Sequence, residues 1–172
     1  MTLKITPLSG TIGAEISGID LRNLSNSEFD AVHRAFLDHA VLCFRNQDLT
    51  PDDQIAFARR WGEIHDHPYL NGLPDRPEII EIVKEAGERN RFGAYWHTDQ
   101  IFTPTPAMAT MLYAKEVPPV GGDTLFASLT SAYDALSDGM KAMASRLRTL
   151  NLYDKQSPRS KRMAEKIPNR ET

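Results

Sequence analysis

The sequence has little of several features that would assign a protein class at once. It contains one cysteine, Cys43, among 172 residues, so a disulfide framework within the chain is excluded. Because Cys43 lies in the apolar run VLCF, we expect a small buried hydrophobic residue rather than a reactive thiol. No apolar run approaches the length of a spanning helix. The formal net charge of −3 gives no electrostatic reason to expect nucleic acid or an anionic membrane as a partner.

What the chain does contain is typical of a globular domain. Hydrophobic residues make up 41% and charged residues 25%, which suits one domain with its own core. The N-terminus, MTLKITPLSG, has no apolar stretch of the signal-peptide type, so a cytoplasmic location is expected. Residues 154–172 are rich in Lys, Arg, Glu, Ser and Pro, and we expect a polar tail or loop after a folded part that covers residues 1–153.

Helix signals are clearest in the first half of the chain. Ser25, with Glu28 three positions later, has the pattern of a capping box. The helical spacing after it predicts four core-facing residues: Phe29, Val32, Phe36 and Leu37. Thr50 can cap a second helix that starts at Pro51. Two further helices are expected, from a cap at Ser128 through Ala135 and over about 138–148.

Strands are expected around the polar motifs. The apolar patterns predict short strands within residues 3–19 and at 41–45, 78–84, 107–114 and 124–127. Because the helices come early and do not alternate regularly with strands, the order favours an α+β fold over repeated βαβ units.

The densest group of chemically active residue types is YWHTDQIF, residues 95–102. In an extended segment, residues two apart point to the same side, so His97 and Asp99 should project together. A neutral imidazole and a carboxylate on one face form two corners of the facial triad that binds non-haem Fe(II), and zinc is the alternative metal. Taken alone, the spacing also fits an exposed strand end. Tyr95 and Trp96 are expected to shield the site.

Two other polar clusters have a functional and a structural interpretation. In PPVGGDTLFAS, residues 118–128, the Thr124 hydroxyl could donate a hydrogen bond to an anionic ligand, although a plain turn explains the motif equally. In GEIHDHP, residues 62–68, His65 and His67 are again two apart, and a zinc hydrolase using His65, His67 and His97 is an alternative function.

Four separated motifs together resemble the taurine dioxygenase and 2,4-dichlorophenoxyacetate dioxygenase family of Fe(II)- and 2-oxoglutarate-dependent enzymes. The resemblance runs in family order from about residue 3 to about residue 152. It is carried by four segments: GAEISGIDL (13–21), VLCFRNQDLTPDDQIAFARRWGEIHDHP (41–68), WHTDQIFTPTPA (96–107) and VPPVGGDTLFASLTSAYDALS (117–137).

The resemblance implies a fold, cofactors and residue roles. It implies a double-stranded β-helix, a relative of the jelly roll, with flanking helices. It implies that His97 and Asp99 bind Fe(II) and that Thr124 helps to hold the distal carboxylate of the cosubstrate 2-oxoglutarate. The implied reaction consumes O2, hydroxylates a small organic acid, and releases succinate and CO2. Related halogenases lack the carboxylate ligand, so Asp99 favours hydroxylation. A homo-oligomer is also plausible for this family.

The resemblance also marks departures that bear on the substrate and on completeness. His67 matches a histidine that contacts the sulfonate in taurine dioxygenases, but Gly93 stands where those enzymes have an asparagine, so another sulfonate or a carboxylate fits as well. The family uses a second histidine ligand and an arginine that pairs with 2-oxoglutarate. No histidine follows His97, and no arginine sits in the expected motif. We therefore expect residues 1–153 to be the N-terminal part of a dioxygenase domain; the alternative is a non-catalytic binding or interaction module.

Overall fold

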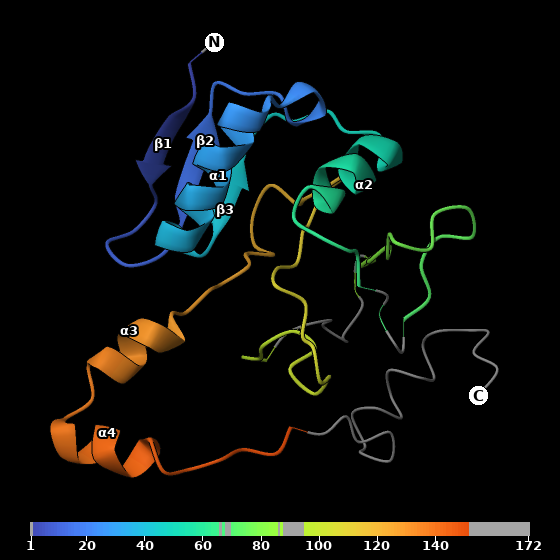
Figure 1. Ribbon diagram of the computed structural model, residues 1–172. Helices are drawn as coiled ribbons and strands as arrows, with labels where there is room; N and C mark the ends of the chain where they lie inside the picture. The colour runs from blue at the N-terminus through green and yellow to red at the C-terminus, as the bar shows by residue number, and fades with distance from the viewer. Residues whose placement is uncertain (1, 66, 68–69, 86, 88–94, 152–172) are drawn as a thin grey trace.

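A three-stranded mixed sheet organises the N-terminal part of the protein (Figure 1). The computed structural model describes residues 2–65, 67, 70–85, 87 and 95–151. Strand β1 (Lys4–Pro7) pairs antiparallel with β2 (Ala14–Ser17), and β2 pairs parallel with β3 (Leu42–Phe44). The strands expected within 3–19 and at 41–45 are therefore confirmed.

Helix α1 (Asn26–His39) connects β2 to β3 and lies across one face of the sheet (Figure 1). The capping box is present: the Ser25 backbone N–H donates to the Glu28 carboxylate at 2.9 Å, and the Glu28 N–H donates to the Ser25 hydroxyl at 3.3 Å. The helix ends at Ala40, whose φ of 59° is left-handed. The predicted start of this helix is confirmed.

The first core cluster lies between α1 and the sheet. Ile16, Val32 and Ala35 are 1%, 0% and 2% exposed. One predicted core residue was wrong, because Leu37 is 66% exposed. Five residues along a helix correspond to a rotation of about 140° from Val32, which turns Leu37 away from the sheet. The side of α1 that faces the sheet therefore contains Val32 and Phe36 but not Leu37.

A second core cluster joins the short 3-10 helix η1 (Leu21–Asn23) to α2 (Pro51–Arg59). Its buried members are Leu21, Leu49 and Phe57. The predicted start of α2 is confirmed, since the Thr50 hydroxyl accepts from the Asp53 N–H at 3.2 Å and the Asp53 carboxylate accepts from the Thr50 N–H at 2.9 Å. These two clusters make the packed N-terminal unit, which we define as residues 3–61.

Two short helices follow much later in the chain and lie apart from the N-terminal unit (Figure 1). Helix α3 (Leu129–Asp134) is capped by Ser128, and α4 (Asp138–Ala144) is capped by Ser137. The expected helices are confirmed, although α4 ends before residue 148. Neither helix contains a buried residue. No helix in the described part of the chain is long and apolar enough to cross a membrane.

Three predicted strands were wrong: residues 78–84, 107–114 and 124–127 belong to no strand. Apolar alternation indicates which side of a segment could be buried, but a strand also needs a second segment to complete its backbone hydrogen bonds. The exposure of Val83, Leu112 and Leu125 agrees with this. The described residues fit the α+β class, whereas the double-stranded β-helix stays a prediction. Gly93 and the expected tail at 154–172 lie outside the described residues.

The first core cluster predicts unequal effects of two substitutions on one helix. Val32→Ala removes buried methyl groups and should lower the free energy of unfolding by about 2 kcal/mol. Leu37→Ala, the matched control on the exposed side of α1, should change it by less than about 0.5 kcal/mol. Urea unfolding followed by circular dichroism measures both. Equal losses would contradict the packing described for α1.

The two capping boxes predict a dependence of stability on pH. Hydrogen bonds from Ser25 hold the pKa of Glu28 below its ordinary 4.5, and those from Thr50 hold the pKa of Asp53 below 3.8. Because both pKa values are lower in the folded state, this stabilisation is complete above the ordinary values. It is lost as the pH falls through the lower folded-state values.

We therefore expect Glu28→Gln/Asp53→Asn to lose less thermal stability than the parent chain between about pH 5 and about pH 3. Melting temperatures measured by circular dichroism across this range test the prediction. The double variant Glu116→Gln/Asp134→Asn, which changes two exposed carboxylates outside the caps, is the control and should follow the parent. A parallel loss in the capping variant and the parent would show that the caps do not set this dependence.

Candidate metal centre

His97 and Asp99 meet in space, as their spacing predicted. The Nε2 atom of His97 lies 3.1 Å from Oδ1 of Asp99. The two side chains are 44% and 51% exposed, so the pair is open to solvent on one side. The segment does not belong to a sheet, yet the two residues still project to a common side. The two predicted ligands therefore lie together although no strand holds them.

The backbone fixes which nitrogen of His97 faces Asp99. Nδ1 lies 2.6 Å from the carbonyl oxygen of Tyr95, and a carbonyl can only accept a hydrogen bond. Nδ1 therefore carries the hydrogen, and a neutral ring has its lone pair on Nε2, directed at the Asp99 carboxylate. A hydrogen bond of this kind commonly orients metal-binding histidines. These two electron-rich atoms can hold a cation between them.

The separation of these atoms suits a shared divalent cation. Two ligands that each lie about 2.1 Å from a metal, at right angles to each other, are about 3.0 Å apart. One imidazole nitrogen and one carboxylate oxygen are two of the three ligands in a 2-His-1-carboxylate iron site. The donor set and its spacing therefore fit the predicted iron.

The described residues do not complete a ligand set. No group of three or more His, Cys, Asp or Glu side chains within them could hold a metal ion. The zinc site considered for His65, His67 and His97 is therefore not assembled in the described part of the chain. His97 and Asp99 are thus a pair of candidate ligands, which we call the half-site.

The structure adds a residue that the sequence did not single out. The Thr110 hydroxyl donates to Oδ2 of Asp99 at 2.7 Å. The two oxygens of Asp99 thus have different neighbours, since Oδ1 faces His97 and Oδ2 is held by Thr110. Nothing in the sequence distinguishes Thr110 from other hydroxyl residues, because the contact spans eleven positions and depends on how the chain reverses.

The reversal begins directly after Asp99. Gln100 has a φ of 49°, in the left-handed region that non-glycine residues seldom occupy. Its carbonyl oxygen accepts from the Thr103 N–H at 2.9 Å and from the Thr103 hydroxyl at 3.0 Å. This turn redirects the chain so that Thr110 can return to Asp99.

The returning segment is attached to the N-terminal unit. Met111 and Tyr113 pack against the cluster of Leu21, Leu49 and Phe57. The Tyr113 hydroxyl donates to the carbonyl oxygen of Gln47 and accepts from the Leu49 N–H, both at 3.1 Å. Tyr113 follows Thr110 by three positions, so these contacts connect the half-site to the packed core through the backbone between the two residues.

The other predicted site residues lie elsewhere. His67 is half-buried, and its Nδ1 accepts from the Leu70 N–H at 3.0 Å. Thr124 is exposed and follows Gly121 and Gly122, whose φ angles of 80° and 77° form the predicted turn. In the described residues no hydrogen bond joins Thr124 to His97 or Asp99.

Two further expectations at the site were not met. Tyr95 and Trp96, which were expected to shield the ligands, are 68% and 71% exposed, so the shielding prediction was wrong. No described helix or strand packs over them, and sequence apolarity cannot supply that cover. Cys43 is only half-buried, so its predicted burial is partial.

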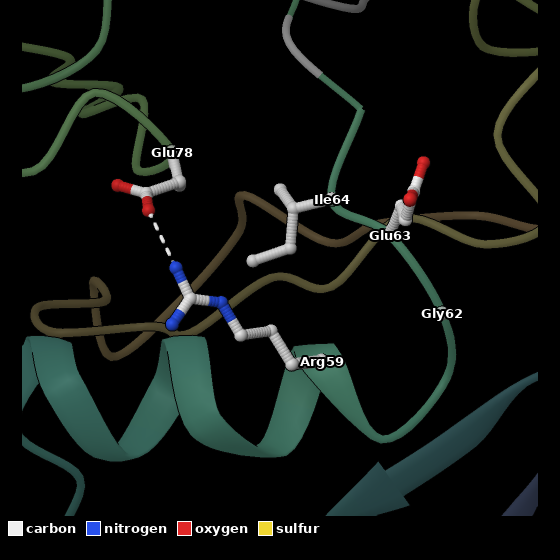
Figure 2. Close-up of a pocket in the computed structure, with 5 residues that line it drawn as sticks. All are labelled: Arg59, Gly62, Glu63, Ile64 and Glu78. Atoms are coloured by element: carbon white, nitrogen blue, oxygen red, sulfur yellow. Dashed lines mark hydrogen bonds and ion pairs between the residues drawn. The ribbon is translucent and has the colours of Figure 1, made fainter.

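A surface hollow of about 670 Å³ lies beside α2 (Figure 2). It is lined by Arg59, Gly62, Glu63, Ile64 and Glu78. Arg59 donates to Glu78 at 3.1 Å across this hollow, so the only guanidinium in the lining already has a carboxylate partner. Because the lining contains neither predicted metal ligand, the hollow and the half-site are separate features.

Comparison with known proteins identifies the class. The family model described as "Taurine catabolism dioxygenase TauD, TfdA family" matches residues 4–172. The chain belongs to this family, and the resemblance predicted from the four motifs is confirmed. This family is described as one of dioxygenases.

Individual relatives agree with this assignment. The chain is 36% identical over 155 residues to (S)-phenoxypropionate/alpha-ketoglutarate-dioxygenase of Delftia acidovorans, covering 83% of this chain and 52% of the relative. Among solved structures, a taurine dioxygenase from Burkholderia xenovorans matches with a TM-score of 0.74 and 34% identity, covering 84% of this chain and 51% of the other.

A second solved structure carries ligands. AAD-2 in complex with Mn(II) and N-oxalylglycine matches with a TM-score of 0.62 and 32% identity, over 84% of this chain and 51% of that one. In each comparison the chain spans about half the length of the protein that it matches.

Proposed function

We propose that this chain forms the N-terminal part of an Fe(II)- and 2-oxoglutarate-dependent dioxygenase in which His97 and Asp99 are iron ligands. The observation that carries the proposal is the 3.1 Å approach of His97 Nε2 to Asp99 Oδ1, with the opposite ring nitrogen held by the Tyr95 carbonyl. Together they present one nitrogen and one oxygen to a single point. Family membership supplies the dioxygenase class.

Each residue of the proposed centre has a distinct task. His97 and Asp99 would hold the iron, and a third protein ligand and 2-oxoglutarate would complete the site. The exposed Thr124 hydroxyl donates a hydrogen bond to the distal carboxylate of 2-oxoglutarate. With the iron and 2-oxoglutarate bound, oxygen is activated for hydroxylation, while 2-oxoglutarate is converted to succinate and CO2. The complex of AAD-2 with Mn(II), a divalent ion like Fe(II), supports this cofactor pair.

We assign the substrate to the class of small organic acids, either sulfonates or carboxylates. The named relatives act on phenoxypropionate and on taurine, which are a carboxylate and a sulfonate. His67 is the proposed contact to the acid group, because it matches the histidine that contacts the sulfonate in taurine dioxygenases and an imidazole N–H can donate to an anion.

The architecture proposed for the complete domain is a double-stranded β-helix. The family model matches residues 4–172, and the relatives are about twice as long as the matched region. We infer that the strands that complete this fold, the third iron ligand and the arginine for 2-oxoglutarate lie outside the described part. A second copy in a homo-oligomer is an alternative source.

The iron assignment predicts a ligand-specific loss of binding. Anaerobic titration of the purified chain with Fe(II) and 2-oxoglutarate should produce the visible charge-transfer band of the chelate. His97→Ala and Asp99→Ala should each weaken metal binding by at least about 100-fold, because even outer partners of metal ligands are worth about 10–100-fold.

His65→Ala is the matched control, since it removes an exposed histidine that the iron proposal does not use. It should leave the metal affinity unchanged. Weakening by His65→Ala as well as by His97→Ala would favour the zinc interpretation, which uses both histidines. A folded parent chain without any band would contradict the proposal for this chain and favour a non-catalytic binding module.

The role of Thr124 predicts a selective effect on 2-oxoglutarate. Thr124→Val should weaken 2-oxoglutarate binding by about 10-fold or more, because a charge-assisted hydrogen bond contributes about 1.5–3 kcal/mol. Binding of Fe(II) alone should not change. Isothermal titration of each ligand separates the two effects, and Thr130→Val on α3 serves as the control. Unchanged 2-oxoglutarate affinity would contradict this role.

A further inference from the structure

We propose that Thr110 is a positioning residue that holds Asp99 as a one-oxygen metal ligand, and that Tyr113 fixes Thr110 in place. This inference rests on the proposed function of His97 and Asp99 and extends it to residues that have no direct contact with the metal. Neither Thr110 nor Tyr113 is among the residues that the sequence predicted for the site.

The first step of the argument is the different surroundings of the two carboxylate oxygens. Oδ2 of Asp99 accepts the Thr110 hydroxyl at 2.7 Å, whereas Oδ1 lies 3.1 Å from His97 Nε2. A carboxylate free to rotate can present either oxygen, or both, to a metal. With Oδ2 engaged, Oδ1 is the oxygen that faces the histidine. The hydroxyl therefore selects which oxygen binds and fixes the carboxylate plane.

The second step is the exposure of the pair. At 44% and 51% exposure, His97 and Asp99 receive little support from surrounding packing. Holding such exposed side chains in a single geometry costs conformational entropy. The hydrogen bond that His97 donates to the Tyr95 carbonyl and the one that the Thr110 hydroxyl donates to Asp99 are the constraints seen in the described residues. Each ligand is thus held by one neighbour on the side away from the metal position.

The third step is the attachment of Thr110 itself. Thr110 lies beside Met111, which packs against the core, and three positions before Tyr113. The Tyr113 hydroxyl is held at 3.1 Å by both the Gln47 carbonyl and the Leu49 N–H. The Gln47 side chain in turn accepts from the Leu21 N–H at 3.0 Å. Thr110 is therefore positioned by the N-terminal unit rather than by a flexible connection.

The test measures the affinity of the 172-residue chain for Mn(II) without any turnover. The electron paramagnetic resonance signal of free Mn(II) decreases on binding, which gives a dissociation constant. We expect Thr110→Val, which keeps the shape but removes the hydroxyl, to weaken Mn(II) binding by about 10–100-fold. Thr110→Ser keeps the hydroxyl and should restore binding to within about threefold of the parent. Thr105→Val makes the same change earlier in the connection and should have no effect.

Tyr113→Phe tests the attachment separately. It removes the hydroxyl that joins Gln47 and Leu49 but leaves Thr110 intact, and we expect a smaller loss of Mn(II) affinity than for Thr110→Val. Urea unfolding of every variant shows whether the N-terminal unit remains folded. A positioning role requires that Thr110→Val weakens Mn(II) binding while its unfolding midpoint stays at the parent value.

The outcomes separate this inference from the proposed function. If His97→Ala and Asp99→Ala weaken Mn(II) binding but Thr110→Val does not, the metal site stands and the positioning role is overturned. If Thr110→Ser is as weak as Thr110→Val, the hydroxyl is not the active group and the inference also fails. If neither His97→Ala nor Asp99→Ala changes Mn(II) affinity, or the parent chain does not bind Mn(II), both the function and the inference are overturned.

Discussion

The hydroxyl of Tyr113 is the contact on which the arrangement of the site depends. It connects a segment that follows the predicted metal ligands to the backbone at Gln47 and Leu49, which belongs to the packed N-terminal unit. The half-site has no sheet of its own and is largely open to solvent. The position of such an exposed pair depends on the segments that hold it. Here the segment that returns to Asp99 is held by a core of residues much earlier in the chain. The functional geometry is thus derived from packing at Leu21, Leu49 and Phe57.

The features that could be predicted from sequence are those determined within a few residues. Both capping boxes and the starts of α1 and α2 follow from side chains that reach their own backbone three positions away. The approach of His97 to Asp99 is equally local, since it requires only a spacing of two residues. The failures involve longer distances. Segments such as 107–114 have the alternation of a strand, but pairing depends on a second segment that alternation does not specify. The contact of Thr110 with Asp99 could not be predicted, because it forms only after the chain has reversed at Gln100.

The hollow beside α2 shows that the presence of a cavity does not by itself indicate the functional site in this chain. That hollow has volume, but its guanidinium is paired with Glu78 and its lining lacks the predicted ligands. The half-site at His97 and Asp99 has no comparable enclosure, yet its donor atoms are directed at a common point with their outer atoms engaged. The chemical identity and orientation of donor atoms therefore outweigh concavity here. Membership of the dioxygenase family agrees with the donor atoms of the half-site, whereas the hollow contains neither His97 nor Asp99.

The order of elements in the N-terminal unit has a consequence for how the protein is made. Strands β1, β2 and β3 and helices α1 and α2 are consecutive in the chain, and their two core clusters are built mainly from residues before position 62. Structures whose contacts are close in sequence form quickly, and N-terminal parts emerge first during synthesis. On the ribosome, this unit can pack while the residues around His97 are still being added. The growing chain then meets a surface that already contains the Gln47 and Leu49 backbone groups, and the segment that follows His97 and Asp99 packs against this existing template.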